Sequence, residues 1–254
     1  KLVQPTGLSM RRILPFSTPV VYTNEMKKVI FGIFAHPDDE AFGPAGTLIQ
    51  EVQNGSELHL ITITAGKAGS NPDNYDDLGQ IRLEEWRRSG ELIGATTMTH
   101  LGYQDLPLSN TSMIEIADTI DQQVRTVIDE RQPDSVEFIT FELGGISGHI
   151  DHIVAARAVC LVFYRLRPYE PCLHRVRLFC LPKSLQPDQN TGWVFMDAGY
   201  DDEQLEKIDV SSVLDQRIAV IETHKTQRSD GAIHLKRLRT QQFAATYDYF
   251  AIRD

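Results

Sequence analysis

The chain has 254 residues, a length that suits one globular domain with a substantial core. Its hydrophobic fraction of 41% and charged fraction of 24% are those of an ordinary folded protein. The formal net charge of −10 argues against a nucleic-acid partner, because such partners usually require a basic surface. No apolar run approaches the roughly 20 residues that a membrane-spanning helix needs. We therefore expect a protein that binds neither nucleic acid nor a membrane.

The first residues of the chain differ in pattern from the rest. Within residues 1–25, apolar residues are scattered, and Pro15 and Pro19 interrupt the one short apolar stretch. A secretory signal needs a continuous apolar segment and a small-residue cleavage site, which this stretch does not provide. We predict that residues 1–25 are an accessory extension, or one introduced for expression, ahead of a single domain over residues 26–254.

The main domain alternates between two patterns. Short apolar runs rich in β-branched residues are typical of strands, and apolar residues that recur every three or four positions are typical of amphipathic helices. In chain order, the expected elements are a strand over Val29–Phe34, a helix over Glu40–Gln53, a strand over Leu58–Thr64, a helix over Asp77–Gly94, a strand over Thr97–Gly102, a helix over Ile114–Ile128, a strand over Ser135–Phe141, a helix over His152–Leu166, a strand over Val176–Leu181, an edge strand over Trp193–Met196, and helices over Ser211–Lys225 and Ile233–Tyr249.

This alternation predicts a Rossmann-like, doubly wound α/β fold with a mostly parallel sheet flanked by helices. In such sheets, ligands bind beyond the carboxyl ends of the strands, near the switch in strand order. Three cysteines, Cys160, Cys172 and Cys180, have no Cys-x-x-Cys pairing, so we expect reduced thiols and a cytoplasmic protein.

A cluster of polar residues, Ala35-His36-Pro37-Asp38-Asp39-Glu40, directly follows the first predicted strand. His36 and Asp39 are three residues apart, so both can point the same way as a helix begins, and both side chains are ligands for divalent metals. The carboxylate of Asp38 is then free to act as a general base. An acidic helix N-terminus is the plainer interpretation, but it leaves His36 unexplained.

A second cluster, Gly148-His149-Ile150-Asp151-His152, follows the fourth of the long strands. His149 and His152 lie on one face if a helix starts here, and Asp151 can fix a ring tautomer by accepting its second N–H. Solvated histidines at a polar helix start are the alternative for this cluster taken alone. Because the fold brings the carboxyl ends of strands together, the two clusters favour one shared metal site.

Together, the AHPDDE and GHIDH motifs resemble those of the PIG-L/LmbE-type zinc-dependent N-acetylglucosaminyl de-N-acetylases. Further stretches are similar to other motifs of this family, namely ITITAGKAGS, IRLEEWRRSGELIGA, HLGYQD and ETHKTQ. The resemblance extends over roughly residues 28–228. The family includes enzymes that act on GlcNAc-inositol, GlcNAc-malate and GlcNAc-phosphatidylinositol, so the resemblance implies a hydrolase that removes acetyl from an N-acetylglucosamine-type sugar or glycoconjugate.

The resemblance also implies a metal centre in which His36, Asp39 and His152 hold one Zn²⁺ per chain. Three protein ligands leave a fourth position open for water, whose pKa the cation lowers. By the same resemblance, Asp38 is the general base that takes the proton of that water.

The remaining roles follow the same matching of motifs. His149 is implied to be a general acid or oxyanion stabiliser, and Asp151 to orient His149 or a metal ligand. Arg82 and Asp105 match positions that contact the sugar. Lys67 departs from the acidic residue that is common at its position, which puts the charge of the sugar pocket in doubt.

Several residues have two interpretations on pattern alone. Gly66 and Gly69 either let the backbone approach a ligand or belong to a plain loop. Arg82 on an amphipathic helix is more often a solvated residue, and only the motif match assigns it to a site. His224 with Gln227 either lines the cleft or ends a helix.

Two other functions compete with the hydrolase. A non-catalytic sugar-binding protein on the same scaffold would lack bound zinc and release no acetate. A nucleotide-binding Rossmann domain is disfavoured, because Gly43-Pro44-Ala45-Gly46 lacks the Gly-x-Gly-x-x-Gly order. The sequence leaves the aglycone open, and it is compatible with a homo-oligomer.

Overall fold

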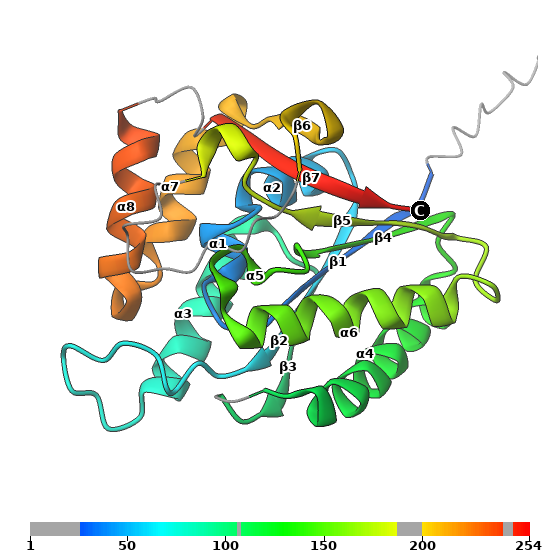
Figure 1. The fold of residues 1–254 in the computed structure, drawn as a ribbon, viewed down its shortest axis with the longest axis horizontal. Helices are drawn as coiled ribbons and strands as arrows, with labels where there is room; N and C mark the ends of the chain where they lie inside the picture. The colour runs from blue at the N-terminus through cyan, green and yellow to red at the C-terminus, as the bar shows by residue number, and fades with distance from the viewer. Residues whose placement is uncertain (1–25, 106–107, 187–199, 241–245) are drawn as a thin grey trace, which may run out of the picture.

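A seven-stranded sheet in the order β3-β2-β1-β4-β5-β7-β6 forms the centre of the molecule (Figure 1). The computed structural model describes residues 26–105, 108–186, 200–240 and 246–254. The first five strands run parallel, and β7 is antiparallel to both β5 and β6. The strands are β1 (Lys28–Phe34), β2 (Glu57–Thr64), β3 (Thr97–Tyr103), β4 (Ser135–Phe141), β5 (Leu173–Phe179), β6 (Glu206–Asp209) and β7 (Tyr247–Arg253).

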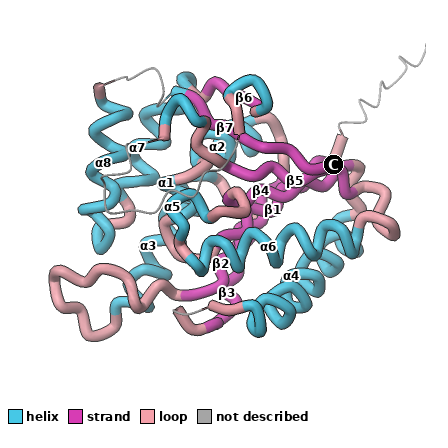
Figure 2. Tube along the Cα trace, in the orientation of Figure 1, coloured by secondary structure: helices cyan, strands magenta, loops and turns pink. Residues whose placement is uncertain are grey.

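Helices cover both faces of the sheet, as the cyan and magenta tubes of Figure 2 show. The helices α4 and α6 pack together on one face, and α1, α2, α3, α7 and α8 belong to the other layer. Their bounds are α1 (Asp39–Phe42), α2 (Ala45–Gln53), α3 (Leu78–Ile93), α4 (Asn110–Arg131), α5 (Gly145–Gly148), α6 (Ile150–Leu166), α7 (Leu214–Glu222) and α8 (Arg228–Arg239), with 3-10 turns η1 (Lys183–Leu185), η3 (Asp202–Gln204), η4 (Ser211–Val213) and η5 (Lys225–Gln227).

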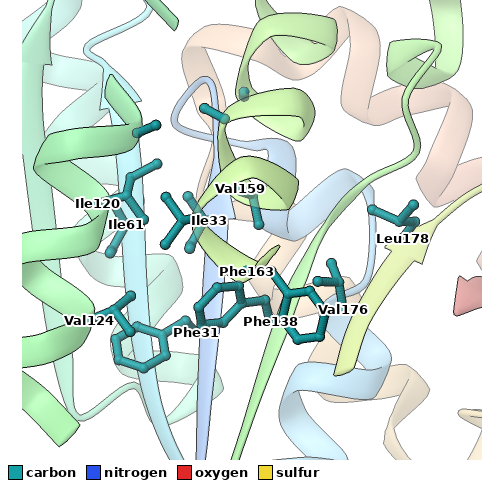
Figure 3. Packing of buried hydrophobic residues seen from close by; sticks show 14 of the residues in the cluster. Phe31, Ile33, Ile61, Ile120, Val124, Phe138, Val159, Phe163, Val176 and Leu178 are labelled. Atoms are coloured by element: carbon teal, nitrogen blue, oxygen red, sulfur yellow. The ribbon is translucent and has the colours of Figure 1, made fainter. Parts of the chain in front are cut away.

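The two hydrophobic cores follow from the alternation of side chains along the strands. On β1, Phe31 and Ile33 face α4 and α6, whereas Ile30 and Phe34 face the opposite layer. Figure 3 shows Phe31 beside Phe138 of β4, with Phe163 of α6 next to it. Because β1 is buried on both faces from Val29 onward, its sequence from that residue to Phe34 is continuously apolar.

The strand order changes direction at β1, whose two neighbours are β2 and β4. The carboxyl ends of β1 and β4 therefore lie side by side at the switch point. His36 follows β1, and His149 and His152 follow β4. This topology confirms the predicted Rossmann-like class and brings the two sequence motifs to one edge of the sheet.

One predicted helix is divided in two. The segment predicted as a helix over Glu40–Gln53 consists of α1 and α2, separated at Gly43 and Pro44. Pro44 lacks the backbone N–H that a continuous helix would need and disfavours helical geometry in the residue before it. The short α1 that results keeps the Asp39 side chain close to the end of β1.

The prediction of a helix over Ile233–Tyr249 is wrong at its C-terminal end. Helix α8 ends at Arg239, and the strand β7 begins at Tyr247. Tyr249 and Ala251 face one core and Phe250 the other, which is the period of a strand. The predicted strand over Trp193–Met196 and residues 1–25 lie outside the described residues, and strand β6 was not predicted.

Two smaller expectations concern the thiols and the membrane. Cys160, Cys172 and Cys180 are free thiols. Within the described ranges, no helix combines the length and the apolar character that a bilayer crossing requires.

Candidate metal centre

Three side chains from the two motifs converge at the carboxyl ends of β1 and β4. The Nδ1 atom of His36 lies 3.1 Å from Nε2 of His152, and the same Nε2 lies 3.2 Å from Oδ1 of Asp39. The ligand atoms of His36, Asp39 and His152 all lie within 4.8 Å of one another. The structure thus brings the three predicted metal ligands together.

The hydrogen bonds behind the two rings suit a cation between them. Nε2 of His36 faces carboxylate oxygens of Asp105 and Asp151, at 3.2 and 3.4 Å. Nδ1 of His152 is 3.3 Å from the carbonyl oxygen of Gly145. When each of these nitrogens carries the ring proton, the converging nitrogens and the Asp39 oxygen are all acceptors. Three converging lone pairs from two imidazoles and one carboxylate fit a divalent cation such as Zn²⁺.

The electrostatics of this centre favour positive charge. Burial alone would lower the pKa of His36, but hydrogen bonds to Asp105 and Asp151 and the charge of Asp39 raise it to about 10. The pKa of Asp39 is lowered, because the attraction of His152 and His36 outweighs the burial that would raise it. A cation bound by Asp39 would supply this positive charge while His36 stays neutral and its Nε2–H donates to Asp105 and Asp151.

Asp38, the neighbour of Asp39 in the chain, has a constrained conformation. Its φ is 117° and its ψ −23°, a left-handed region that a residue with a side chain rarely adopts. The backbone N–H of Asp38 donates to Oε2 of Glu40, and its Oδ2 accepts from the guanidinium of Arg82 at 2.9 Å. Burial raises the pKa of Asp38 to about 6, and the charge of Arg82 opposes that rise. The carboxyl group therefore ionises close to neutral pH.

Arg82 is buried, and its guanidinium joins α3 to the turn after β1 and to the loop after β2. Besides Asp38, it donates to the carbonyl oxygens of Pro37 and Gly66, each at 2.7 Å. A Cβ at Gly66, where φ is +64°, would lie 2.6 Å from the guanidinium carbon, and one at Gly69 would also collide with Arg82. These two glycines let the loop wrap around Arg82, so the group they approach is a side chain of this protein. The sugar contact expected of Arg82 remains a prediction.

Asp105 and Asp151 lie behind His36. One oxygen of Asp105 faces His36, and the other accepts from the backbone N–H of Ala68 at 2.7 Å. Asp151 is fully buried, and its Oδ1 accepts from the N–H of Leu108 at 3.1 Å. Asp151 therefore faces His36, a predicted metal ligand, which is one of the two targets expected for it. A sugar contact by Asp105 remains a prediction, and here its carboxylate supports His36.

His149 is half-buried beside His36 and His152, the two histidines of the candidate metal site. Its ring centroid is 5.0 Å from that of His36 and 4.7 Å from that of His152. Its Nδ1 accepts from the backbone N–H of Asp151 at 3.2 Å, so the ring proton of the neutral form is on Nε2. Burial and the charge of the neighbouring imidazoles lower the pKa of His149. A neutral ring with a free Nε2–H can donate a hydrogen bond to an oxyanion.

A buried group behind Asp38 was not recognised from the sequence. Glu40 Oε1 accepts from Ser89 at 2.5 Å and faces Nε2 of His224 at 3.0 Å. Both Glu40 and His224 are inaccessible to solvent, and Glu40 Oε2 holds the N–H of Asp38. His224 therefore supports the AHPDDE turn from a segment 184 residues away. The ETHKTQ motif indicated that His224 has a role, but a local motif cannot show that its partner is Glu40.

The sequence is similar to a known family profile and to several deacetylase sequences. The PIG-L family profile, described as GlcNAc-PI de-N-acetylase, matches residues 31–163. The 1D-myo-inositol 2-acetamido-2-deoxy-alpha-D-glucopyranoside deacetylase of Mycolicibacterium smegmatis is 24% identical over 239 residues, with 81% of each chain covered. The protein of the same name from Mycolicibacterium vanbaalenii is 26% identical over 239 residues, covering 81% of this chain and 82% of its own.

Solved structures share the fold. The N,N'-diacetylchitobiose deacetylase from Pyrococcus horikoshii superposes with a TM-score of 0.64 at 18% identity, covering 90% of this chain and 84% of that one. The zinc-inhibited form of teicoplanin deacetylase gives 0.59 at 16% identity, with 89% and 98% covered. The profile match includes both the AHPDDE and GHIDH motifs and more than half of the sequence, and the chain therefore belongs to the PIG-L family of GlcNAc-PI de-N-acetylases.

Proposed function

We propose that this protein is a zinc-dependent amidohydrolase that removes the acetyl group from an N-acetylglucosamine-type sugar or glycoconjugate. The observation that carries the proposal is the convergence of His36 Nδ1, Asp39 Oδ1 and His152 Nε2, with the Asp38 carboxyl group on the adjacent residue. A cation held by these three residues would act as a Lewis acid toward an acyl oxygen and a water molecule.

Asp38 is the general base of the proposed reaction. Its pKa of about 6 leaves it mostly ionised at neutral pH, yet basic enough to accept a proton from an attacking water molecule. The contacts of Arg82 and Glu40 hold the carboxylate in one orientation, so little reorganisation is needed when the proton moves.

His149 is the proposed donor to the developing oxyanion. Because its Nδ1 is occupied by the N–H of Asp151, its Nε2–H is the group available to the substrate. A neutral imidazole donates this hydrogen bond without a prior protonation step. After the amide carbon has become tetrahedral, the proton held on Asp38 can pass to the leaving amine as the carbon–nitrogen bond breaks.

Relatives of the chain support the substrate class. The Mycolicibacterium relatives are named as deacetylases of an acetamido-deoxy-glucopyranoside of inositol, and the Pyrococcus horikoshii structure as a deacetylase of diacetylchitobiose. Both names describe an acetylated amino sugar with different groups attached to it. We therefore propose a 2-acetamido-glucose unit as the recognised part, with the attached group set by the surroundings of the site.

An acetate-release assay tests this proposal. Purified protein is stripped with a chelator and assayed before and after addition of Zn²⁺ on N-acetylglucosamine, its inositol conjugate and N,N'-diacetylchitobiose. We expect acetate release from at least one substrate only in the zinc-restored sample. Sugar binding without zinc and without acetate release would instead support the non-catalytic alternative.

The Asp38→Asn variant tests the base. Replacement removes the proton acceptor while leaving His36, Asp39 and His152 in place, so we expect zinc content to be retained and kcat to fall by about 10²–10⁴. Metal analysis and acetate release measure the two quantities on the same sample. The matched control is Asp73→Asn, which alters an exposed loop carboxylate paired with Arg228. Full turnover in Asp38→Asn at saturating substrate would remove Asp38 from the mechanism.

A further inference from the structure

The turn between β4 and α6 is organised by one buried carboxylate, Glu142. Its backbone N–H continues the sheet by donating to the carbonyl oxygen of Phe179 on β5, at 2.9 Å. Its side chain accepts from two backbone N–H groups of the turn, those of Gly144 at 2.5 Å and Ile146 at 2.7 Å. Glu142 thus ties the turn to the rigid centre of the sheet.

The residue held by this carboxylate is conformationally strained. Ile146 has φ 64° and ψ −64°, the backbone geometry of a γ-turn that is rare even for residues without a branched Cβ. A β-branched side chain makes this conformation still less favourable. Such a conformation persists only when surrounding contacts enforce it, and the N–H of Ile146 donates directly to Glu142 Oε1.

The strained turn ends on a metal ligand. The carbonyl oxygen of Gly145, which belongs to the peptide unit joined to Ile146, lies 3.3 Å from Nδ1 of His152. Gly145 also packs against His152, since a Cβ added there would lie 3.0 Å from the Cβ of His152. The orientation of this peptide therefore decides whether the Nδ1–H of His152 has an acceptor. When the ring proton is kept on Nδ1, the lone pair of Nε2 is available to bind a cation.

We propose that Glu142 is a positioning residue that holds the strained Ile146 turn so that the Gly145 carbonyl fixes the tautomer and orientation of His152. The proposal rests on the zinc site proposed above. A carboxylate suits this role because it accepts both backbone N–H groups and offers no donor of its own. A glutamine would place an amide N–H against one of the two donors, and the turn could then relax away from its strained conformation.

A double-mutant cycle tests this proposal through metal affinity. Zinc affinity is measured by competition with a chromophoric chelator for the wild type, Glu142→Gln, Ile146→Gly and the double variant. We expect Glu142→Gln to weaken zinc binding by about 10–100-fold, the range found when groups that orient metal ligands are altered. In the Ile146→Gly background, where glycine adopts a positive φ without strain, we expect the same change to cost less than about threefold.

A purely structural role gives a different pattern. It would lower the melting temperature of the metal-free protein without changing zinc affinity, or would weaken binding equally in both backgrounds, and either result overturns the proposal. If Glu142→Gln alone does not fold, the double variant should fold and bind zinc, and its failure to do so also overturns the proposal. The visible spectrum of the Co²⁺ form reports on His152 separately, and we expect it to change in Glu142→Gln and to return in the double variant.

Asp248→Asn is the matched control. Asp248 is a fully buried carboxylate that accepts from the N–H and hydroxyl of Thr47 and pairs with Arg217, all on other elements. We expect this variant to lower the melting temperature and to leave zinc affinity unchanged. A wild-type protein that binds neither Zn²⁺ nor Co²⁺ would contradict the proposed metal centre itself, whereas normal binding by both wild type and Glu142→Gln would contradict only the role of Glu142.

Discussion

Asp38 experiences two opposing influences that set its proton affinity. Burial favours the neutral acid, and the guanidinium of Arg82 at 2.9 Å favours the carboxylate. The same guanidinium holds the backbone at Pro37 and Gly66. Arg82 therefore acts on Asp38 both through charge and through geometry, and two substitutions can separate these contributions.

We expect Arg82→Met to move the acidic limb of the kcat/KM profile to higher pH by about one unit or more. The sign follows from the charge: without Arg82 the pKa of Asp38 rises, so the base becomes protonated, and activity is lost, at a higher pH. Arg82→Lys keeps a positive charge near Asp38, so the acidic limb of its kcat/KM profile should stay near that of the wild type. A lysine cannot donate to Asp38, Pro37 and Gly66 together, so we expect kcat to fall by about tenfold or more. A pH series of initial rates measures both effects.

Arg228→Met is the control for this comparison. Arg228 pairs with Asp73 at the protein surface, and its removal changes the net charge of the protein by the same amount as Arg82→Met. A shift of equal size in Arg228→Met would assign the effect to net charge. An acidic limb that is identical in Arg82→Met and wild type would show that Asp38 does not determine it.

The segment formed by α7, η5 and the start of α8 supports the site from the C-terminal third of the chain. His224 contacts Glu40 of α1, and Glu85 of α3 accepts from both the N–H and the hydroxyl of Thr226. Gln227 donates to the carbonyl oxygen of Ser70 in the loop that wraps Arg82. Four hydrogen bonds, from His224, Thr226 and Gln227, thus join this segment to the parts of the chain that carry Asp38 and its partners.

We expect His224→Leu to lower kcat by about 10–100-fold with a smaller change in zinc affinity, since Glu40 loses one partner and its hold on the N–H of Asp38 loosens. His224→Gln keeps an N–H donor near Glu40 and should retain most of the activity. His59→Leu is the matched control, because His59 on β2 is also a buried histidine that contacts a carboxylate, that of Glu57 on the same strand. Equal losses in His224→Leu and His224→Gln would indicate that the imidazole acts in some other way.

Some helices and strands could be predicted from the local sequence pattern, and others could not. The strand β1 was predictable because burial on both faces leaves a continuous apolar run in the sequence. The ends of α3 were predictable because Asp and Gly are common at helix ends: Asp77 accepts from the N–H of Gln80, and Gly94 adopts a left-handed conformation. The strand β7 was missed because Asp248 is a buried polar residue within it, paired with Arg217 from α7. Contacts between distant segments, such as His224 with Glu40, leave no local pattern.

Two histidines that contact the ring of Phe42 have opposite electrostatic surroundings. The ring centroid of His224 lies 5.9 Å from that of Phe42, and the ring of His234 stacks on Phe42 at 5.2 Å with an interplanar angle of 8°. Burial alone would lower the pKa of His224, but Glu40 raises it. Burial lowers the pKa of His234 to about 4, and the charges of Arg217 and Arg237 contribute in the same direction.

These two histidines give the stability of the whole molecule opposite dependences on pH. The contribution of His224 is present below its unfolded pKa of about 6.5 and is lost as pH rises through its raised folded pKa. For His234 the unfolded chain binds a proton more readily than the folded protein. Stability is therefore lost as pH falls from about 6.5 toward about 4.

We expect His234→Phe to remove the acid-side loss while keeping the stack on Phe42. A shift from 6.5 to about 4 corresponds to roughly 2 kcal/mol of lost stability at pH 5 relative to pH 8. Chemical denaturation of both proteins at a series of pH values measures the difference between their free energies of unfolding. That difference should grow in favour of the variant below pH 6.5 by about this amount, because contributions from all other groups cancel. A difference that is constant from pH 8 to pH 5 would mean that His234 accepts a proton equally well in the folded and the unfolded state.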